Sequence, residues 1–373
     1  MEPFSIQVVP STIFAIAMLS IFVIESGCGT GTPPVITQTT PAIPPSTYWR
    51  RDAQAAQSST CSAHLETLRG QLHEQPMTTL LAVRGDQVVF SEGPIDHATQ
   101  IASIRKSLLA MLYGQPVEDG RLRLDATLDE LHFDDIGGLL PIERQARVRD
   151  LIESRSGVYH LAANAGDDEG AAPPRGSQPP GNYFLYNNWD FNAAGAIYVQ
   201  LTGRDIYDAF DSDIARPLGL EDFRRASQQY AGDPTRSKHL AYAFHLSARD
   251  MAKVGELMLA GGRWGDRQLV PADWVHTITT QVTPSSEMHP THAAQRDVGY
   301  GMMWWVPRGD PGSPLQDSFM AWGLFGQWIL VMPRSGLVVV EKYDVSVPLT
   351  ARIPTVPVST FLQEAVGIAE AGC

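Results

Sequence analysis

Segments with the composition of β-strands lie near both ends of this chain, and a long segment of helical character separates them. Residues 78–83 and 87–91 are rich in apolar and β-branched residues, and the Arg84-Gly85-Asp86 break between them is typical of a hairpin. Similar runs return near the other end, at residues 300–306, 318–322, 327–332 and 337–343. We therefore predict an α+β fold, with one antiparallel sheet built from both chain ends and flanked by helices.

The middle of the chain, residues 118–282, is predicted to be an inserted, mostly helical subdomain, interrupted by a Gly/Pro-rich loop at 167–181. Gly114 and Pro116 are expected to end the helix that precedes it. Helices outside the insertion are predicted at residues 53–75, 101–113 and 358–371.

The N-terminal region has the composition of a targeting segment. Residues 12–24 form an apolar run of about signal-peptide length, short for a spanning helix. Small residues then precede Cys28, as in a bacterial lipobox, although Glu25 and an n-region without Lys or Arg depart from that pattern. We expect a signal peptide or lipoprotein leader over residues 1–28, with Cys28 as the lipidated residue. The alternative is an uncleaved anchor or a divergent leader.

A Thr/Pro-rich tether, residues 29–50, is expected to link this leader to a single domain, residues 51–373. The protein should then be exported, to the periplasm or outer cell envelope, and contact a membrane only through its leader or lipid anchor. Cys61 and Cys373 lie near the edges of the domain, where an oxidising compartment would allow them to pair. Two unrelated thiols remain the alternative.

The charge of the chain argues against nucleic-acid binding. The formal net charge is -13, and lysine occurs only at positions 106, 238, 253 and 342. Nucleic-acid affinity comes mainly from Lys and Arg side chains that neutralise phosphates. Lys106 is unusual among these lysines because it lies in an apolar helical stretch.

Ser103 and Lys106 are separated by three positions at the start of the predicted helix 101–113, so their side chains share one helix face. A serine hydroxyl needs a nearby base to become a nucleophile, and a lysine amine can supply one. The helix start also offers unpaired N–H groups to a developing oxyanion. Such a short pattern is also compatible with a surface lysine on an ordinary helix.

Tyr186 and Asn188 form a Tyr-x-Asn pattern that could supply a phenol as proton carrier and an amide to hold the lysine. A phenol becomes a usable base only beside a positive charge such as Lys106. The alternative is an aromatic turn whose asparagines, Asn187 and Asn188, cap the next helix, and Asp190 could cap it too.

A glycine-containing turn, residues 321–327, precedes an apolar strand and would let a ligand approach the strand backbone at Trp322, Gly323 and Leu324. The apolar run 302–305 is expected to pack in the core, with Trp304 or Trp305 as a possible pocket residue. His160, His289 and His292 are interpreted as structural or solvated, so no metal site is expected. The sequence also lacks a Gly-x-Ser-x-Gly elbow.

Taken in order, these motifs resemble the serine β-lactamase and penicillin-recognising family, in its class C and family VIII esterase branch, which includes oligoamide hydrolases. Supporting segments occur at residues 122–131, 148–159, 194–203, 217–220, 248–250 and 299–305. The resemblance implies that Ser103 is acylated while Lys106 and Tyr186 shuttle protons. It also implies that Asn188 positions the substrate, that the N–H groups of Ser103 and Leu324 bind the oxyanion, and that no cofactor is needed.

The same resemblance implies a disulfide between Cys61 and Cys373, because the first and last helices of that fold pack side by side on the sheet. It also exposes a departure: relatives carry Lys-Thr-Gly or His-x-Gly where this chain has Ala321-Trp322-Gly323. Trp322 offers apolar area without a charge. We therefore expect an uncharged ester or amide substrate. A non-catalytic relative that binds cell-wall peptide or another ligand, and a β-lactamase or D-Ala-D-Ala carboxypeptidase, are the alternatives.

Overall fold

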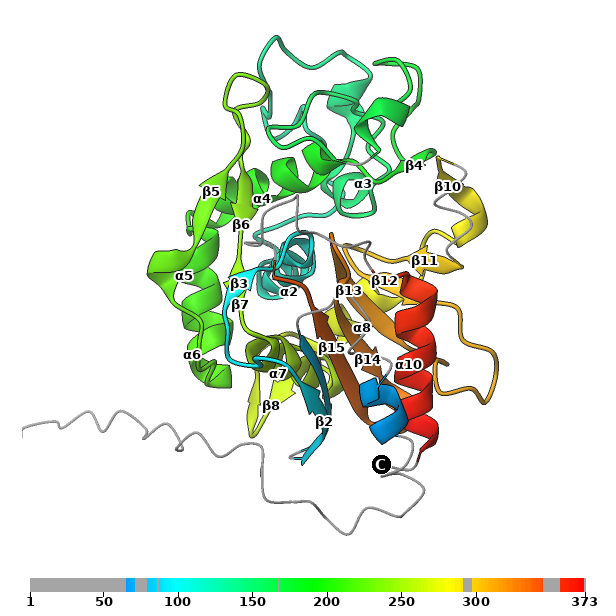
Figure 1. Ribbon diagram of the computed structural model, residues 1–373. Helices are drawn as coiled ribbons and strands as arrows, with labels where there is room; N and C mark the ends of the chain where they lie inside the picture. Colours follow the sequence, from blue (N-terminus) through cyan, green and yellow to red (C-terminus); the bar gives the residue numbers. More distant parts are fainter. Residues whose placement is uncertain are drawn as a thin grey trace, which may run out of the picture. The chain divides into compact units, whose positions relative to one another are not determined.

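The sheet at the centre of the fold joins strands from both ends of the chain. The computed structural model describes residues 65–70, 79–85, 87–166, 168–290, 297–344 and 356–371. Among these residues, seven strands form one antiparallel sheet in the order β11-β12-β13-β14-β15-β1-β2 (Figure 1). Their bounds are β1 Thr79–Arg84, β2 Gln87–Glu92, β11 Val298–Tyr300, β12 Trp305–Pro307, β13 Phe319–Gly323, β14 Gln327–Met332 and β15 Leu337–Lys342. The pairing of β1 with β15 confirms the predicted α+β fold.

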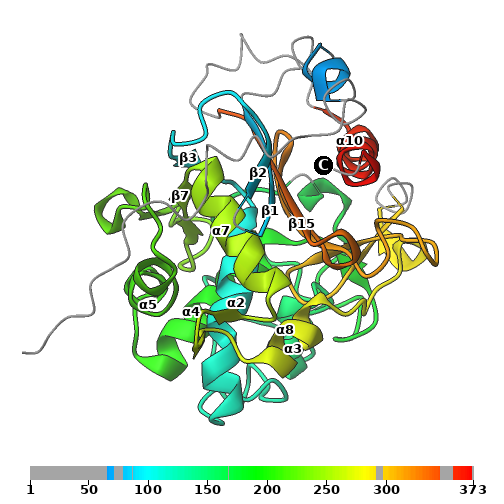
Figure 2. The same ribbon diagram turned by 90° about the horizontal axis from the view of Figure 1, so that it is seen from below.

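Both faces of the central strands are covered. Every residue of β14 and β15 is buried, which explains why their sequences are nearly continuous apolar runs. Helix α7, Ala248–Leu259, packs against β14 and β15. The C-terminal helix α10, Val358–Glu370, lies on the opposite face of the sheet (Figure 2).

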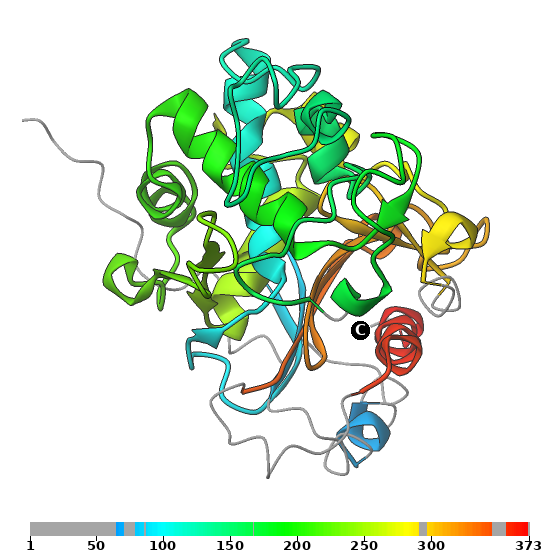
Figure 3. The same ribbon diagram turned by 90° about the horizontal axis from the view of Figure 1, so that it is seen from above.

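Helix α2, Ile104–Glu118, lies between the sheet and the inserted region, with contacts to β13 and β14 on one side and to α4, α5 and α8 on the other (Figure 3). It is buried around nearly its whole circumference, as expected for a helix that is apolar on all sides. Besides α7, the helices of the insertion are α3 Val148–Ile152, α4 Asn188–Thr202, α5 Ile206–Phe210, α6 Arg216–Leu218 and α8 Ala272–Thr279. Two-stranded pairs are formed by β3 Thr99–Gln100 with β7 His245–Leu246, β4 Phe184–Leu185 with β10 Met288–His289, β5 Gln229–Ala231 with β6 Ala241–Ala243, and β8 Arg263–Trp264 with β9 Arg267–Gln268.

Helix α2 continues past the point where Gly114 and Pro116 were expected to end it. A Cβ on Gly114 would lie 2.7 Å from Trp274 Cδ1, so this glycine makes room for α8 rather than terminating the helix. Pro116 lies in the last turn, where its ring removes a single backbone hydrogen bond. The prediction of a stop at these residues was therefore wrong by about one turn.

The apolar run 300–306 forms parts of two strands rather than one. A turn separates β11 from β12, and Met303 within it has a φ of 60°. The turn is buried, and the backbone groups of Met303 find partners: Met303 N donates to Ile152 O at 3.0 Å, and Ser107 Oγ donates to Met303 O at 2.6 Å. Because the turn is as apolar as the strands, its hydrophobicity could not reveal it.

The insertion is less helical than its composition predicts. Residues 119–142 contain no α-helix, and aspartate side chains organise the turns there. Asp134 Oδ1, for example, accepts from the backbone N–H groups of Asp135 and Leu139 at 3.0 and 2.9 Å. Such local side-chain bonds compete with helix formation.

Several predictions fall wholly or partly outside the described residues. Of the helix expected at 53–75, residues 65–70 are helical and the remainder is not described. The leader, the tether, Cys28, Cys61 and Cys373 also lie outside the described part of the chain. Within that part, no helix combines the length and apolar character needed to cross a bilayer.

Candidate active site

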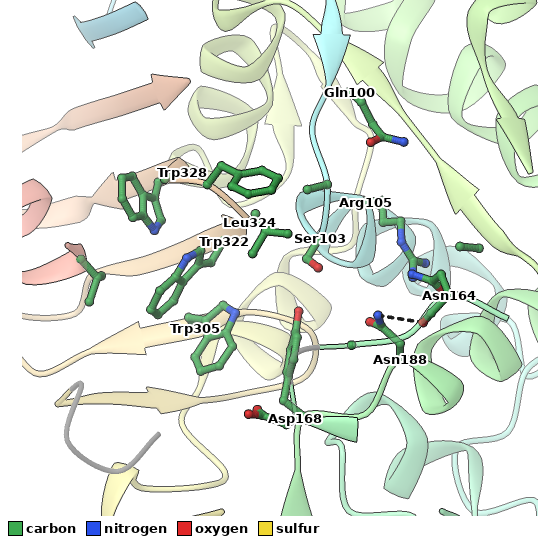
Figure 4. A pocket seen from close by; sticks show the side chains of 18 of the residues that line it. Gln100, Ser103, Arg105, Asn164, Asp168, Asn188, Trp305, Trp322, Leu324 and Trp328 are labelled. Carbon is green, nitrogen blue, oxygen red and sulfur yellow. Dashed lines mark hydrogen bonds between the residues drawn. The ribbon is translucent and has the colours of Figure 1, made fainter. Parts of the chain in front are cut away.

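Ser103 lies at the start of α2, directly after a strained turn. Ala102 has a φ of 49°, a left-handed conformation that costs a non-glycine residue roughly 1–3 kcal/mol. Backbone hydrogen bonds hold the turn: Ile101 N donates to Phe244 O at 3.0 Å, and Ile104 N donates to Ile101 O at 3.2 Å. The turn directs the Ser103 side chain into a cavity, as Figure 4 shows.

Lys106 connects the candidate catalytic residues. Its Nζ donates to Ser103 Oγ at 3.0 Å, to Tyr186 OH at 2.8 Å and to Asn188 Oδ1 at 2.7 Å. These three oxygens match the three donors of a protonated lysine. The residue is 1% exposed, and its Nζ lies 4.0 and 4.4 Å from the ring centroids of Tyr186 and Phe191, close enough for cation–π attraction. The structure thus brings together the hydroxyl, amine, phenol and amide that the sequence singled out.

Tyr186 lies in the turn between β4 and α4, and Asn188 is the first residue of α4. The cap of α4 is Asn187, whose Oδ1 accepts from Trp189 N at 3.0 Å. One of the asparagines expected to cap this helix therefore does so, whereas the further candidates Asn188 and Asp190 do not. Asn187 Nδ2 also donates to Val158 O at 2.7 Å, which ties the turn to the neighbouring loop. With Asn187 in the capping position, the Asn188 side chain is available to meet Lys106.

Asp190 in the first turn of α4 has a different environment. Its carboxyl is buried and accepts from Ser156 Oγ at 2.6 Å. Burial raises the pKa of Asp190 well above its usual range, although the Ser156 hydrogen bond opposes this. Asp190 therefore lies buried beside the site, where Ser156 binds its carboxyl.

Behind Asn188 lies a chain of polar side chains that the sequence analysis missed. Asn188 Nδ2 donates to Asn164 O at 3.2 Å, and Asn192 Nδ2 donates to Asn164 Oδ1 at 2.9 Å. Arg105 Nη2 donates in turn to Asn192 Oδ1 at 2.8 Å, and Arg105 is only 4% exposed. The sequence carried one signal for this polar chain, because Arg105 is a second cation directly beside Lys106 in an otherwise apolar helix. This chain orients the amide that holds Lys106.

The end of β13 approaches the Ser103 turn closely because Gly323 has no side chain. A Cβ at this position would lie 2.6 Å from Ile101 O. The next residue, Leu324, has its carbonyl bound by Gln327 Nε2 at 3.2 Å and its side chain 44% exposed. Ser103, Gly323 and Leu324 all line the same cavity, as an oxyanion site shared by the two backbones requires.

The cavity above Ser103 has a volume of about 720 Å³. Tryptophans line it on one side of Ser103, and Arg105, Asn164 and Asn188 line the other (Figure 4). Trp305 is one of the tryptophans, whereas Trp304 is fully buried and packs on Phe319 with ring centroids 5.5 Å apart. Of the two tryptophans that the sequence offered as pocket residues, Trp305 lines the cavity and Trp304 packs in the core.

The two described histidines that the sequence interpretation named, His160 and His289, contact backbone and aromatic groups. The ring nitrogens of His160 lie 3.0 and 2.7 Å from the carbonyl oxygens of Leu161 and Ile136. The His289 ring stacks on Tyr183 with centroids 4.1 Å apart, and His292 lies outside the described residues. No group of three or more His, Cys, Asp or Glu side chains that could hold a metal occurs among the residues with described positions.

Comparison with known proteins gives the family. The Beta-lactamase family model matches residues 66–340, well over half of the chain, so the chain belongs to this family. A putative 6-aminohexanoate-dimer hydrolase from Bacillus anthracis has a similar structure, with a TM-score of 0.61, 19% identity and 81% of each chain covered. The hydrolase EstCE1, described as having promiscuous acyltransferase activity, gives a TM-score of 0.56 at 16% identity, covering 84% of this chain and 98% of that one.

A curated sequence relative is the Monacolin J acid methylbutanoyltransferase of Aspergillus terreus. It is 26% identical over 165 residues, which are 36% of this chain and 40% of that protein. The chain therefore matches less than half the length of this relative. Membership of the Beta-lactamase family supports an enzyme.

Proposed function

We propose that the protein is a serine hydrolase that cleaves an ester or amide through a covalent acyl-enzyme on Ser103. The observation that carries the proposal is the position of Lys106 Nζ, within 3.0 Å of the Ser103 hydroxyl and 2.8 Å of the Tyr186 phenol. A binding protein has no chemical need to hold these groups together in a buried, hydrogen-bonded arrangement.

In the proposed acylation step, one member of the Lys106–Tyr186 pair is deprotonated beforehand, and it takes the proton of Ser103 Oγ as this oxygen attacks the substrate carbonyl. The N–H groups of Ser103 and Leu324 stabilise the tetrahedral oxyanion. The leaving alcohol or amine then takes the proton from Tyr186, and the acyl group remains on Ser103. In deacylation a water molecule repeats the attack, with the same pair as base, and releases the carboxylic acid.

The proposed substrate is uncharged at the scissile end. A group that binds a substrate carboxylate at this position would be cationic or polar. Here the position at the end of β13 is occupied by Trp322, which presents an uncharged indole and lines the cavity. β-Lactam or D-Ala-D-Ala cleavage is therefore a less favoured alternative, which nitrocefin turnover would reveal. Transfer of the acyl group to an alcohol rather than to water is a second candidate, favoured by the acyltransferase descriptions of two similar proteins.

A fluorophosphonate probe tests the proposal, because it phosphonylates an activated serine and adds a defined mass. We expect one adduct on the wild-type protein and none on Ser103→Ala. Ser107→Ala is the matched control, since Ser107 lies on the same helix but donates to Met303 O. A well-folded wild-type protein that gains no mass would favour the non-catalytic ligand-binding alternative.

We further propose that the enzyme is exported and tethered to the cell envelope through its N-terminal leader. The apolar run 12–24 and the small residues before Cys28 support this proposal. Cell fractionation with and without Cys28→Ser tests it. Lipidation predicts that the substitution moves the protein from the membrane fraction to the soluble exported fraction. An unchanged distribution would contradict anchoring through this cysteine.

A further inference from the structure

A row of aromatic rings leads away from the catalytic centre along one side of the cavity. The Tyr186 and Trp305 ring centroids are 5.2 Å apart, those of Trp305 and Trp322 are 5.1 Å apart, and those of Trp322 and Trp328 are 6.2 Å apart. All four residues line the cavity. The row therefore begins at the proposed proton carrier and extends over the sheet.

Strand pairing fixes the position of these rings. Trp322 on β13 lies directly opposite Trp328 on β14, and Trp305 on β12 lies opposite Met320, two residues before Trp322. Directly opposite and diagonal partners on adjacent strands are within reach of aromatic side chains. The indoles therefore form a wall held by three strands, not a set of mobile surface groups.

Helix α10 closes the far end of this wall. Residues 356–359, at the beginning of that helix, line the same cavity. The Phe361 ring in its first turns stacks on Trp328, with centroids 4.5 Å apart and an interplanar angle of 12°. We call the part of the cavity between Trp305, Trp322, Trp328 and residues 356–359 the tryptophan arm. It offers a bounded length along which an extended group can lie.

The charges around the cavity disfavour an anion in the tryptophan arm. The charged residues that line the cavity in the described chain are Arg105 and Asp168. Arg105 lies on the other side of Ser103 from the tryptophans and is engaged with Asn192 (Figure 4). Apart from Arg105 and Asp168, the described residues that line the cavity are uncharged, and Leu324 and Phe325 are apolar. A carboxylate there would lose its hydration without meeting a cation.

We propose that the tryptophan arm binds an extended, uncharged apolar substituent of the scissile carbonyl, an aliphatic chain rather than a charged or strongly polar group. This inference rests on the proposed function, since it assigns the substrate class of the same site. The enzyme should accordingly prefer esters or amides with longer apolar chains up to the limit set by α10. Each methylene that enters an apolar site contributes roughly up to a four-fold preference.

Two ester series test the inference and identify which side of the scissile bond enters the arm. In the first, the acyl group of p-nitrophenyl esters lengthens from acetate through butyrate and hexanoate to octanoate; in the second, the alcohol of alkyl acetates lengthens in the same way. We expect kcat/KM of the wild-type enzyme, normalised to fluorophosphonate-reactive sites, to rise at least about ten-fold along one series. Flat profiles in both series, with Ser103 labelled normally, would overturn the inference and leave the proposed function intact.

Substitutions in the tryptophan arm test whether the chain-length preference arises there. Trp322→Ala should reduce the dependence on chain length to within about two-fold, and Ser359→Trp, at the α10 end, should shift the preferred chain to a shorter one. Trp264→Ala is the matched control, because Trp264 lies on β8 outside the cavity, and it should keep the wild-type profile. An unchanged length profile in both arm variants would contradict the assignment.

A binding readout separates this inference from the catalytic proposal. In Ser103→Ala, equilibrium dialysis should show tighter binding of methyl octanoate or of octyl acetate than of methyl acetate, and adding Trp322→Ala should remove most of the difference. Equal binding of all three esters would refute the tryptophan arm even if the enzyme proved inactive. Failure of fluorophosphonate labelling would refute only the proposed chemistry.

Discussion

Substituting Gly323 by alanine should separate the two backbones that form the proposed oxyanion site. The new Cβ would lie 2.6 Å from Ile101 O, whereas an ordinary contact begins at 3.4 Å, so the backbones must move apart by about 0.8 Å. Overpacking of this kind typically costs about 1–3 kcal/mol of unfolding free energy. A misplacement approaching 1 Å at a reacting centre can lower the rate by about 10²-fold. We therefore expect kcat/KM to fall by about two orders of magnitude, with a modest loss of stability.

The assay measures ester hydrolysis per fluorophosphonate-reactive site, together with urea-induced unfolding. Gly70→Ala is the matched control, because a Cβ on Gly70 would meet nothing within 4 Å, and it should leave turnover unchanged. Since the three atoms nearest the new methyl group belong to Ile101, Gln327 and Ile104, slow phosphonylation of Ser103 should remain detectable. Wild-type kcat/KM and stability in Gly323→Ala would refute the close approach of β13 to the nucleophile turn.

Lys106→Ala should lower kcat by at least about 10³-fold by removing the proposed base, while circular dichroism shows a retained fold; normal turnover would contradict the mechanism. Glu153→Gln tests a buried carboxyl whose pKa burial raises to about 7, aided by Asp150 and opposed by Arg149 and Arg155. Because the folded-state pKa exceeds the unfolded value, stability is lost as pH rises from about 4.5 to 7, so the substitution should stabilise the protein by about 2–3 kcal/mol at pH 8 and little at pH 4.5. A pH-independent effect in urea unfolding would exclude this explanation. A non-reducing peptide map should contain Cys61 linked to Cys373, whereas alkylation of both thiols without prior reduction would rule out the disulfide.

The sheet could be predicted because its signal is local and repeated. The strands at 327–332 and 337–342 are apolar along their whole length since both faces are covered, and such runs are visible in composition alone. The pairing of Ser103 with Lys106 was equally accessible, because three positions on a helix bring two side chains onto one face. The approach of Tyr186 depends on contacts across 80 residues of chain. It followed from the family resemblance, since no spacing rule could supply it.

The helix cap, the Met303 turn and the tryptophan arm could not be predicted, because tertiary contacts decide between residues or segments that look alike in sequence. Asn187 and Asn188 are adjacent and identical in type, and the Val158 carbonyl and Trp189 N–H that engage Asn187 determine which residue becomes the cap. The turn at Met303 is hidden because buried turns and buried strands have the same hydrophobicity. The tryptophan arm requires three strands and α10 to meet, and only the assembled sheet brings those residues together.

Trapping of the acyl-enzyme tests the central claim most directly. A rapid acid quench during turnover of a p-nitrophenyl ester, followed by proteolysis and mass spectrometry, should find the acyl mass on the peptide that contains Ser103, with a burst of nitrophenol equal to the enzyme concentration. Continued hydrolysis with no acylated Ser103, or with the acyl group on another residue, would contradict the account.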